Sequence, residues 1–429
     1  MKYANICNRE SNSVNIGDYL QFMAIDNLYT EMGLKEDEII RLKLSEVKTY
    51  MGERLILPIN FFIEYFTSNG KMDISPDITP IFLAAVLHLV EKPFNADAFL
   101  DDSYNKEYFL KHAPIGCRDE ETYTYFTKYN IPAYISGCLT ATFPKIDMIA
   151  GENVVFVDVP KSLMPYIPDS ILKEKILFSN QQFLFSDEEL NDYKNMFRFV
   201  KEKYDFFKKE AKLVVTSRLH TALPCLAFGI PVILVKEKFD TRFSFIENYI
   251  PIYDEENYAI INWNPDVTLF EQLKHDLKLI AISRIKRLEI SEAFKARCIK
   301  VKYFDSFETN AYHGEKFLAY ATENWDKNSA EIKYALWGAK QSNVAYYENF
   351  IKLHYPNAKL SFLIDFNRKG ENFKHPNEIA NYKDVIILVC AVSAVEQAFE
   401  LFEELDLPIS NYAILTHEFI LEDDLKCVK

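Results

Sequence analysis

Apolar residues follow two alternating patterns along the chain, one typical of helices and one of strands. The stretch NIGDYLQFMAIDNLYTEMG reads as a turn and an amphipathic helix, because apolar residues recur at helical spacing through Leu20, Met23, Ala24 and Leu28. Asp18 is the expected cap of this helix. Short apolar runs such as RLILPINFF then alternate with helix-like stretches such as NKEYFLKHA. The alternation predicts an open, mostly parallel α/β sheet.

A second series of the same kind begins near Gly151. Its long amphipathic helix is LNDYKNMFRFVKEKYDFFKKEA, and its strands are ENVVFVDVP, EKILFSN, KLVV and PVILVKE. Ligands of doubly wound sheets bind at the carboxyl ends of the strands. The residues that follow KLVV are therefore candidates for a site.

A third, smaller series lies at the end of the chain. KYALWGAK predicts a strand and a turn, and further strands and helices follow up to NYAILT. We therefore expect an α/β protein with Rossmann-like domains at residues 1–148 and 149–300, and a small additional α/β domain at residues 329–429.

Composition narrows the functional classes. Hydrophobic residues make up 49% of the 429 residues, which is typical of folded domains, and the net charge of -14 speaks against a broad nucleic-acid surface. The seven cysteines are scattered singly without a CxxC pair, so we expect neither disulfides nor a zinc ribbon. The beginning of the chain lacks the apolar core of a signal peptide, and we expect a cytoplasmic protein.

An arginine and a histidine stand two residues apart in TSRLHTALPCLAFGIP, directly after the strand KLVV. Arg218 offers a planar fork suited to carboxylate or phosphate, and the helix predicted from Thr221 favours an anion at its start. Gly229 is expected to end that helix. Two interpretations stay open at this point: an anion site, or an interdomain salt bridge by Arg218 with a satisfied polar contact by His220.

Two further segments place polar residues at expected strand or helix ends. Arg118 follows the strand of PIGCRDEE and either binds a ligand or pairs with the acids at 119–121, which open the next helix. Gly17 allows a tight turn, and Asp18 is either a base or only an N-cap.

Several other functional classes receive little or no support. HExxH, GxxxxGK[ST] and GxSxG motifs are absent, and no histidine has metal-like spacing, so we expect no metal. The WGAK turn at residues 337–340 lacks GxGxxG, and only Asp365, at the end of the next strand, favours a nucleotide over a simple turn cap.

NIGDYLQ, GCRDEET and SRLHTALPCLAFGIPVI, in this order, resemble the polysaccharide pyruvyl transferase family. The resemblance covers about residues 3–263. It implies a fold similar to the two-domain GT-B glycosyltransferases. It also implies transfer of the pyruvyl group of phosphoenolpyruvate onto two sugar hydroxyls, which gives a cyclic ketal and phosphate.

The resemblance also implies roles for individual residues. Arg118, Arg218 and His220 would contact the phosphoenolpyruvate donor, with His220 as general acid or phosphate partner and Asp18 as the base. The neighbours expected on the donor side are Ser217, Leu219 and Thr221. The residues expected on the acceptor side are Asn15, Gly17, Asp18 and Cys138. Many family members carry an aspartate where this chain has SGCLTATF, so Cys138 is expected to shape the acceptor pocket differently.

The leading hypothesis is a pyruvyl transferase acting on a surface polysaccharide precursor. Phosphoenolpyruvate is its donor, no separate cofactor is needed, and the acceptor is a sugar or a lipid-linked glycan at the inner face of the membrane, with peripheral membrane contact. The alternatives are a GT-B-type glycosyltransferase that uses a nucleotide sugar, and a non-catalytic assembly protein in which the third domain is the working part.

Overall fold

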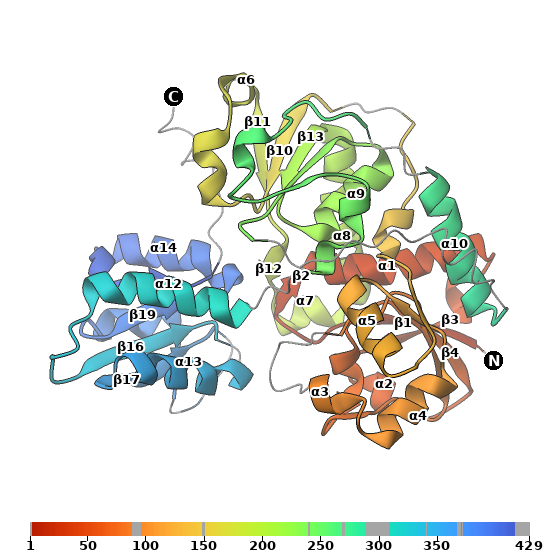
Figure 1. Cartoon of the computed structure of the whole chain (residues 1–429), viewed down its shortest axis with the longest axis horizontal. Coiled ribbons are helices and arrows are strands. Elements are labelled where there is room, and N and C mark those ends of the chain that lie inside the picture. Colours follow the sequence, from red (N-terminus) through yellow and green to blue (C-terminus); the bar gives the residue numbers. More distant parts are fainter. Residues whose placement is uncertain are drawn as a thin grey trace. The chain divides into compact units, whose positions relative to one another are not determined.

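The computed structural model describes residues 2–87, 96–147, 151–238, 241–267, 271–288, 309–339, 341–366, 370 and 372–416 (Figure 1). The chain divides into two compact units. The larger unit comprises Met1–Phe307 with Phe419–Lys429, and the smaller comprises Glu308–Glu418.

The first part of the larger unit contains a parallel sheet in the order β3-β1-β4-β7. Its strands are β1 (Lys2–Asn8), β3 (Ile39–Lys43), β4 (Leu55–Ile59) and β7 (Ile78–Phe82). Burial is almost continuous along β1 and β4, as is typical of parallel strands covered on both faces. Strands β8 (Ile115–Cys117) and β9 (Ala133–Ile135) form a further parallel pair, which a bridge between Ala85 and Cys117 joins to the segment after β7.

The second part of the larger unit contains a five-stranded parallel sheet in the order β11-β10-β13-β14-β15. Its strands are β10 (Asn153–Val157), β11 (Ile176–Ser179), β13 (Ala211–Thr216), β14 (Val232–Val235) and β15 (Ile252–Tyr253). Helix α9 (Leu219–Phe228) connects β13 to β14 and ends at Gly229, as predicted, in a left-handed conformation with φ 87°. The predicted α/β class is confirmed.

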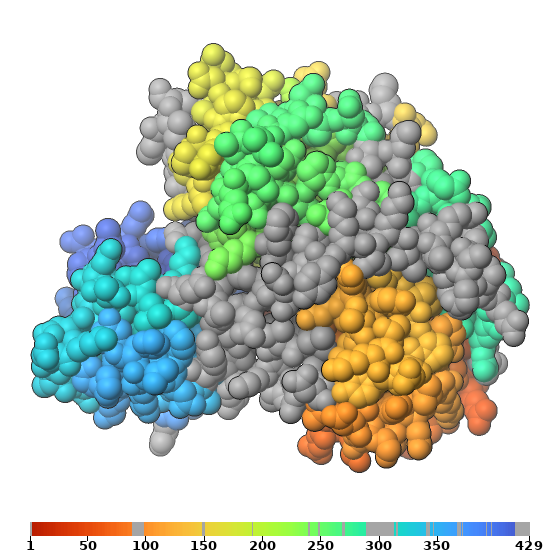
Figure 2. Space-filling view, in the orientation of Figure 1, coloured from red at the N-terminus to blue at the C-terminus, as the bar shows by residue number. Residues whose placement is uncertain are grey.

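The remaining elements of the larger unit are mostly helices beside its two sheets, with a few short strands. The longer helices are α1 (Ile16–Glu31), α4 (Ser103–Lys111), α5 (Glu120–Lys128), α8 (Tyr193–Glu210) and α10 (Glu271–Ile285). The short elements are α2 (Glu46–Thr49), β5 (Thr67–Ser68), β6 (Lys71–Met72), α3 (Ala96–Phe99), α6 (Asp169–Leu172) and α7 (Asp187–Asn191). In Figure 2, the orange segments of the first part and the green segments of the second each form part of the visible face.

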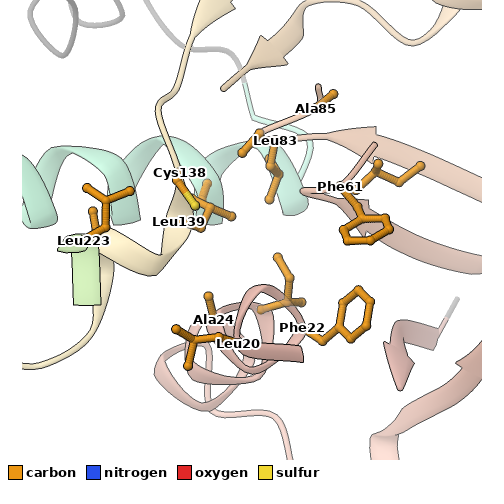
Figure 3. Packing of buried hydrophobic residues seen from close by; sticks show 14 of the residues in the cluster. Leu20, Phe22, Ala24, Phe61, Leu83, Ala85, Cys138, Leu139 and Leu223 are labelled. Carbon is orange, nitrogen blue, oxygen red and sulfur yellow. The ribbon is translucent and has the colours of Figure 1, made fainter. Parts of the chain in front are cut away.

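The two parts of the larger unit are joined by a small antiparallel ribbon and by a shared core. Strand β2 (Ser13–Asn15) pairs with β12 (Gln182–Leu184), and the Ile16 N–H donates to the Gln181 carbonyl at 3.0 Å. Figure 3 shows side chains of α1, of the segment at Cys138 and of α9 in one buried cluster. The domain boundaries predicted at residues 148, 149 and 300 lie outside the described residues.

The smaller unit is a parallel sheet in the order β18-β17-β16-β19-β20, with one hydrophobic cluster on each face. Its elements are α12 (Thr309–Asn324), β16 (Ile332–Trp337), α13 (Gln341–His354), β17 (Ala358–Ile364), β18 (Phe373–Lys374), β19 (Ile386–Val389), α14 (Val395–Glu404) and β20 (Tyr412–Ile414). This unit begins earlier than residue 329, because Phe317 and Ala321 of α12 pack into its core beside Tyr334.

Candidate active site

The first turn of α1 carries a capping residue and a buried ion pair. Asn15 is the N-cap and accepts a hydrogen bond from the Gly17 N–H at 3.0 Å, so the prediction of Asp18 as the cap was wrong. Asp18 lies in the first turn, with 3% of its surface exposed, and its carboxylate pairs with Nη1 of Arg9. Arg9, which the sequence reasoning missed, also donates to the Tyr65 hydroxyl at 2.6 Å.

Gly17 brings the start of α1 against His220. A Cβ atom placed on Gly17 would lie 2.6 Å from both Cβ and Nδ1 of His220. Real Cβ atoms essentially never come so close, so only glycine admits the imidazole at this point. The NIGDYLQ and SRLH segments, more than 200 residues apart, therefore meet directly.

Arg218 and its neighbours are tied to the end of β10. The Arg218 Nε donates to Asp158 Oδ2 at 2.6 Å, and the Ser217 hydroxyl donates to the Asp158 carbonyl at 2.6 Å. Asp158 directly follows β10, the neighbour of β13 in the same sheet, so this salt bridge of Arg218 exists but does not join the two sheets. Thr221 accepts from Gln181 Nε2 at 2.6 Å, and Leu219 packs partly buried against the core.

The His220 imidazole is buried and has an unused nitrogen. Only 9% of the residue is exposed, and its backbone carbonyl accepts from the Tyr204 hydroxyl. Nε2 makes no hydrogen bond within the part of the chain that the structure describes, so a fully satisfied polar contact does not describe this side chain. Burial lowers the pKa of His220 well below its usual value, and the positive charges of Arg118 and Arg242 lower it further. The ring is therefore neutral near pH 7 and lies in a positive potential.

Arg118 is a buried guanidinium that forms no ion pair with any acid in the described part of the chain. It is 2% exposed, its Nη1 donates to Gln21 Oε1 at 3.1 Å, and its Cζ lies 5.1 Å from the centre of the Phe62 ring. Among the described residues, no carboxylate oxygen lies within 4 Å of it, and its buried Nε has no hydrogen-bond partner. Of the two readings left open for Arg118, a direct ion pair with the acids at 119–121 is not found within the described residues. Asp119 caps α5 by accepting from the Thr122 N–H at 2.9 Å, although its charge still acts on Arg118.

Burial lowers the pKa of Arg118, and the charge of Arg242 acts in the same direction. Cys138, Asp119 and Asp18 act in the opposite direction, which places all three in the same electrostatic neighbourhood. Cys138 itself is 1% exposed, and its Sγ lies 3.1 Å from the Thr140 hydroxyl. An unpaired buried charge destabilises a folded protein unless a ligand compensates it.

Arg242 is a basic residue that the sequence reasoning missed. It lies in a short 3-10 helix, Thr241–Phe243, after β14. The Thr241 hydroxyl donates to Glu121 Oε2 at 2.7 Å, and the Glu120 N–H donates to the Ser244 hydroxyl at 3.1 Å. These bonds hold the segment on the start of α5, next to Arg118. No local pattern marks Arg242, since its place depends on contacts more than 100 residues apart in the sequence.

The comparison with known proteins identifies a family for the chain. A family model described as polysaccharide pyruvyl transferase matches residues 15–238, about half of the chain. The chain belongs to the polysaccharide pyruvyl transferase family. The match spans Gly17, Arg118 and His220, but it does not extend to Arg242 or to the smaller unit.

Other comparisons add little to the family membership. No curated protein matches the chain significantly. A solved structure of a functionally uncharacterised protein from Klebsiella pneumoniae is similar to it, with 14% identity, a TM-score of 0.34, and coverage of 56% of this chain and 84% of that one.

Within the described residues, no helix is both long and apolar enough to cross a membrane. Over the same residues, no cluster of three or more His, Cys, Asp or Glu side chains is arranged to hold a metal ion.

Proposed function

We propose that this chain transfers the pyruvyl group of phosphoenolpyruvate onto two hydroxyls of a sugar in a surface polysaccharide precursor. Membership of the pyruvyl transferase family supports pyruvyl transfer in polysaccharide synthesis. The observation that carries the choice of donor is the buried guanidinium of Arg118, which has no carboxylate within 4 Å among the described residues. Phosphoenolpyruvate offers both a carboxylate and a phosphate to such a group.

The donor would lie between Arg118 and His220. Arg118 binds one anionic group, and Arg242 adds positive charge from the segment beside it. Arg218 stands at the start of α9, whose dipole favours an anion there, while its Nε is held by Asp158. The fixed Arg218 therefore defines one wall of the donor site.

The reaction adds the donor to two hydroxyls in sequence. A proton moves to the methylene carbon of phosphoenolpyruvate, and a sugar hydroxyl attacks the adjacent carbon while losing its own proton. The C–O bond to phosphate breaks, the leaving phosphate takes the bonding electrons, and a second hydroxyl attacks the same carbon and loses its proton to close the ketal. One of the two released protons balances the one consumed, and the other leaves with phosphate.

His220 is the proposed source of the proton on the donor. It is neutral in the free protein, because burial and two arginines lower its pKa. The negative charge of a bound donor reverses that potential, so binding draws a proton onto the imidazole, where a general acid is needed. Asp18, buried and paired with Arg9, is the proposed acceptor of the first hydroxyl proton.

The setting of the reaction is also part of the proposal. The two parallel sheets of the larger unit would correspond to the halves of a GT-B-like arrangement, with a boundary near residue 148. Asn15, Gly17 and Cys138 would line the acceptor side. For a lipid-linked acceptor the chain would work in the cytoplasm, at the inner face of the membrane.

The test is incubation with phosphoenolpyruvate and a panel of free and lipid-linked sugars, with phosphate release and the mass of the sugar as readouts. We expect release with a matching mass gain for wild type, and its loss in Arg118→Met. Arg198→Met, which changes an exposed arginine on α8, is the matched control and should behave as wild type. Equal release by wild type and Arg118→Met would contradict the proposal. Thermal stabilisation by nucleoside diphosphates but not by phosphoenolpyruvate would favour a glycosyltransferase instead.

A further inference from the structure

Gln21 lies one helical turn after Gly17 on α1 and is fully buried. Its Oε1 accepts the hydrogen bond from Arg118 Nη1 at 3.1 Å, and its Nε2 lies 3.5 Å from Asp18 Oδ1. Its backbone carbonyl accepts from Asn60 Nδ2 at 2.7 Å, which fixes this turn of the helix. A neutral amide thus faces the buried guanidinium at a position where buried arginines usually meet a carboxylate.

The contacts of Arg118 leave one edge of its fork unused. A guanidinium has five N–H donors in a plane, and the Nε–Nη2 edge presents two parallel donors to a carboxylate or phosphate. Gln21 takes Nη1, on the other side of the fork, and the Phe62 ring lies against the guanidinium. Nε is buried and has no partner among the described residues.

Gly17 and Gln21 are four residues apart and therefore share one face of α1. Gly17 touches the His220 ring, and Gln21 touches the Arg118 guanidinium. Four residues of helix span about 6 Å along the axis. A single helix face thus sets the spacing between the imidazole and the guanidinium, on the scale of one small molecule with two anionic groups.

We propose that Gln21 is a positioning residue that holds Arg118 with its Nε–Nη2 edge toward the donor. Its amide fixes the guanidinium without forming an ion pair with it, so the positive charge stays available to the ligand. A carboxylate in place of the Gln21 amide would itself pair with the guanidinium and neutralise its charge. The inference rests on the proposed function, since it assumes that the ligand is an anionic donor.

The experiment compares Gln21→Glu and Gln21→Met with wild type in the full-length chain. Calorimetry gives the Kd for phosphoenolpyruvate and, separately, for inorganic phosphate, and thermal unfolding gives the Tm. We expect Gln21→Glu to weaken phosphoenolpyruvate binding at least tenfold, because the new carboxylate pairs with Arg118. Its Tm should stay close to that of wild type, since attraction to Arg118 offsets repulsion from Asp18, whose Oδ1 lies 3.5 Å from the replaced amide nitrogen. Gln21→Met should weaken binding less, since it removes the hydrogen bond but leaves the charge. Loss of affinity without loss of Tm separates positioning of a charge from a merely structural role.

Asn105→Asp is the matched control, because it makes the same amide-to-carboxylate change at another fully buried site. Among the described residues, the Asn105 amide bonds to the Gly70 and Phe99 carbonyls and the Met72 N–H, so its change should lower the Tm and leave the Kd within twofold. Should Gln21→Glu fail to fold, the Kd of Gln21→Met decides, and an unchanged value overturns the inference.

The outcomes separate the two proposals. If wild type binds phosphoenolpyruvate and Gln21→Glu binds it with the same Kd, the role of Gln21 is overturned and the proposed function is unaffected. Binding of inorganic phosphate but not phosphoenolpyruvate overturns the function, while a weaker phosphate Kd in Gln21→Glu still supports the positioning role. Binding of neither anion overturns both.

Discussion

Arg118→Met should make the free protein more stable and the enzyme inactive. The change keeps an unbranched apolar stem but removes a guanidinium that is 98% buried and has no acid within 4 Å among the described residues. An uncompensated buried charge costs about 3–5 kcal/mol. The variant also loses the hydrogen bond to Gln21, about 1–2 kcal/mol, and the contact with Phe62, about 1 kcal/mol. The net free energy of unfolding should rise by about 1–2 kcal/mol.

The assay is differential scanning calorimetry of wild type and Arg118→Met, each with and without phosphoenolpyruvate. The Tm of the transition that belongs to the larger unit should rise by about 2–4 °C in the variant without donor, on the order of 2 °C per kcal/mol for a domain of this size. Donor at a hundred times its Kd adds about 2.7 kcal/mol to wild type by mass action, and nothing to a variant that cannot bind. The order of the two Tm values should therefore invert when donor is added. A variant less stable than wild type in both conditions would show that Arg118 is a structural residue and would refute the reasoning.

Four further predictions concern the same site. Phosphoenolpyruvate binding at pH 7, measured by calorimetry in two buffers, should take up close to one proton more in wild type than in His220→Gln, because the donor raises a pKa that is low in the free protein; equal uptake would exclude His220 as the acid. Folding lowers the pKa of His220 below 6.5, so the unfolded chain binds more protons than the folded one at low pH. The free energy of unfolding should therefore decrease as the pH drops below 6.5, and it should decrease less in His220→Gln. Gly17→Ala should lower stability by about 1–3 kcal/mol in chemical unfolding and weaken donor binding, whereas Gly33→Asn, at an open left-handed position, should leave the Kd unchanged. Arg242→Met should raise the pKa of His220, visible by NMR titration, and weaken phosphoenolpyruvate binding about tenfold, as expected for loss of one charge worth about 1.4 kcal/mol; an unmoved pKa would place Arg242 outside the site.

The elements that carry the site were predictable because their signals are local. Apolar runs marked β13 and β14, and Gly229 marked the end of α9. The capping residue of α1 was not predictable in this way, because Asn15 and Asp18 are both good caps. The choice falls on Asn15 because its pairing with Gln182 holds it in the extended conformation that an N-cap requires.

The partners of the basic residues were not predictable, since each comes from a distant part of the chain. Gln21 is 97 residues from Arg118, and Asp158 is 60 residues from Arg218. The local sequence pattern does not predict which helix packs against the end of which strand. The sequence could thus suggest the proposed anion site, but it could not show that Arg218 is held by an acid while Arg118 faces an amide.

The ribbon of β2 and β12 has a consequence for how the protein is made. The residues just before α1 bond to partners near position 185: the Asn12 amide donates to the Phe185 carbonyl at 2.9 Å, and the Asn8 amide to the Leu190 carbonyl at 2.6 Å. A nascent chain that has emerged from the ribosome only as far as residue 147 has its first sheet but none of these partners. The turn that presents Gly17 and Asp18 must therefore wait for the second sheet. A truncated translation product would lack these partners, so the proposed site can assemble only after synthesis has passed the second sheet.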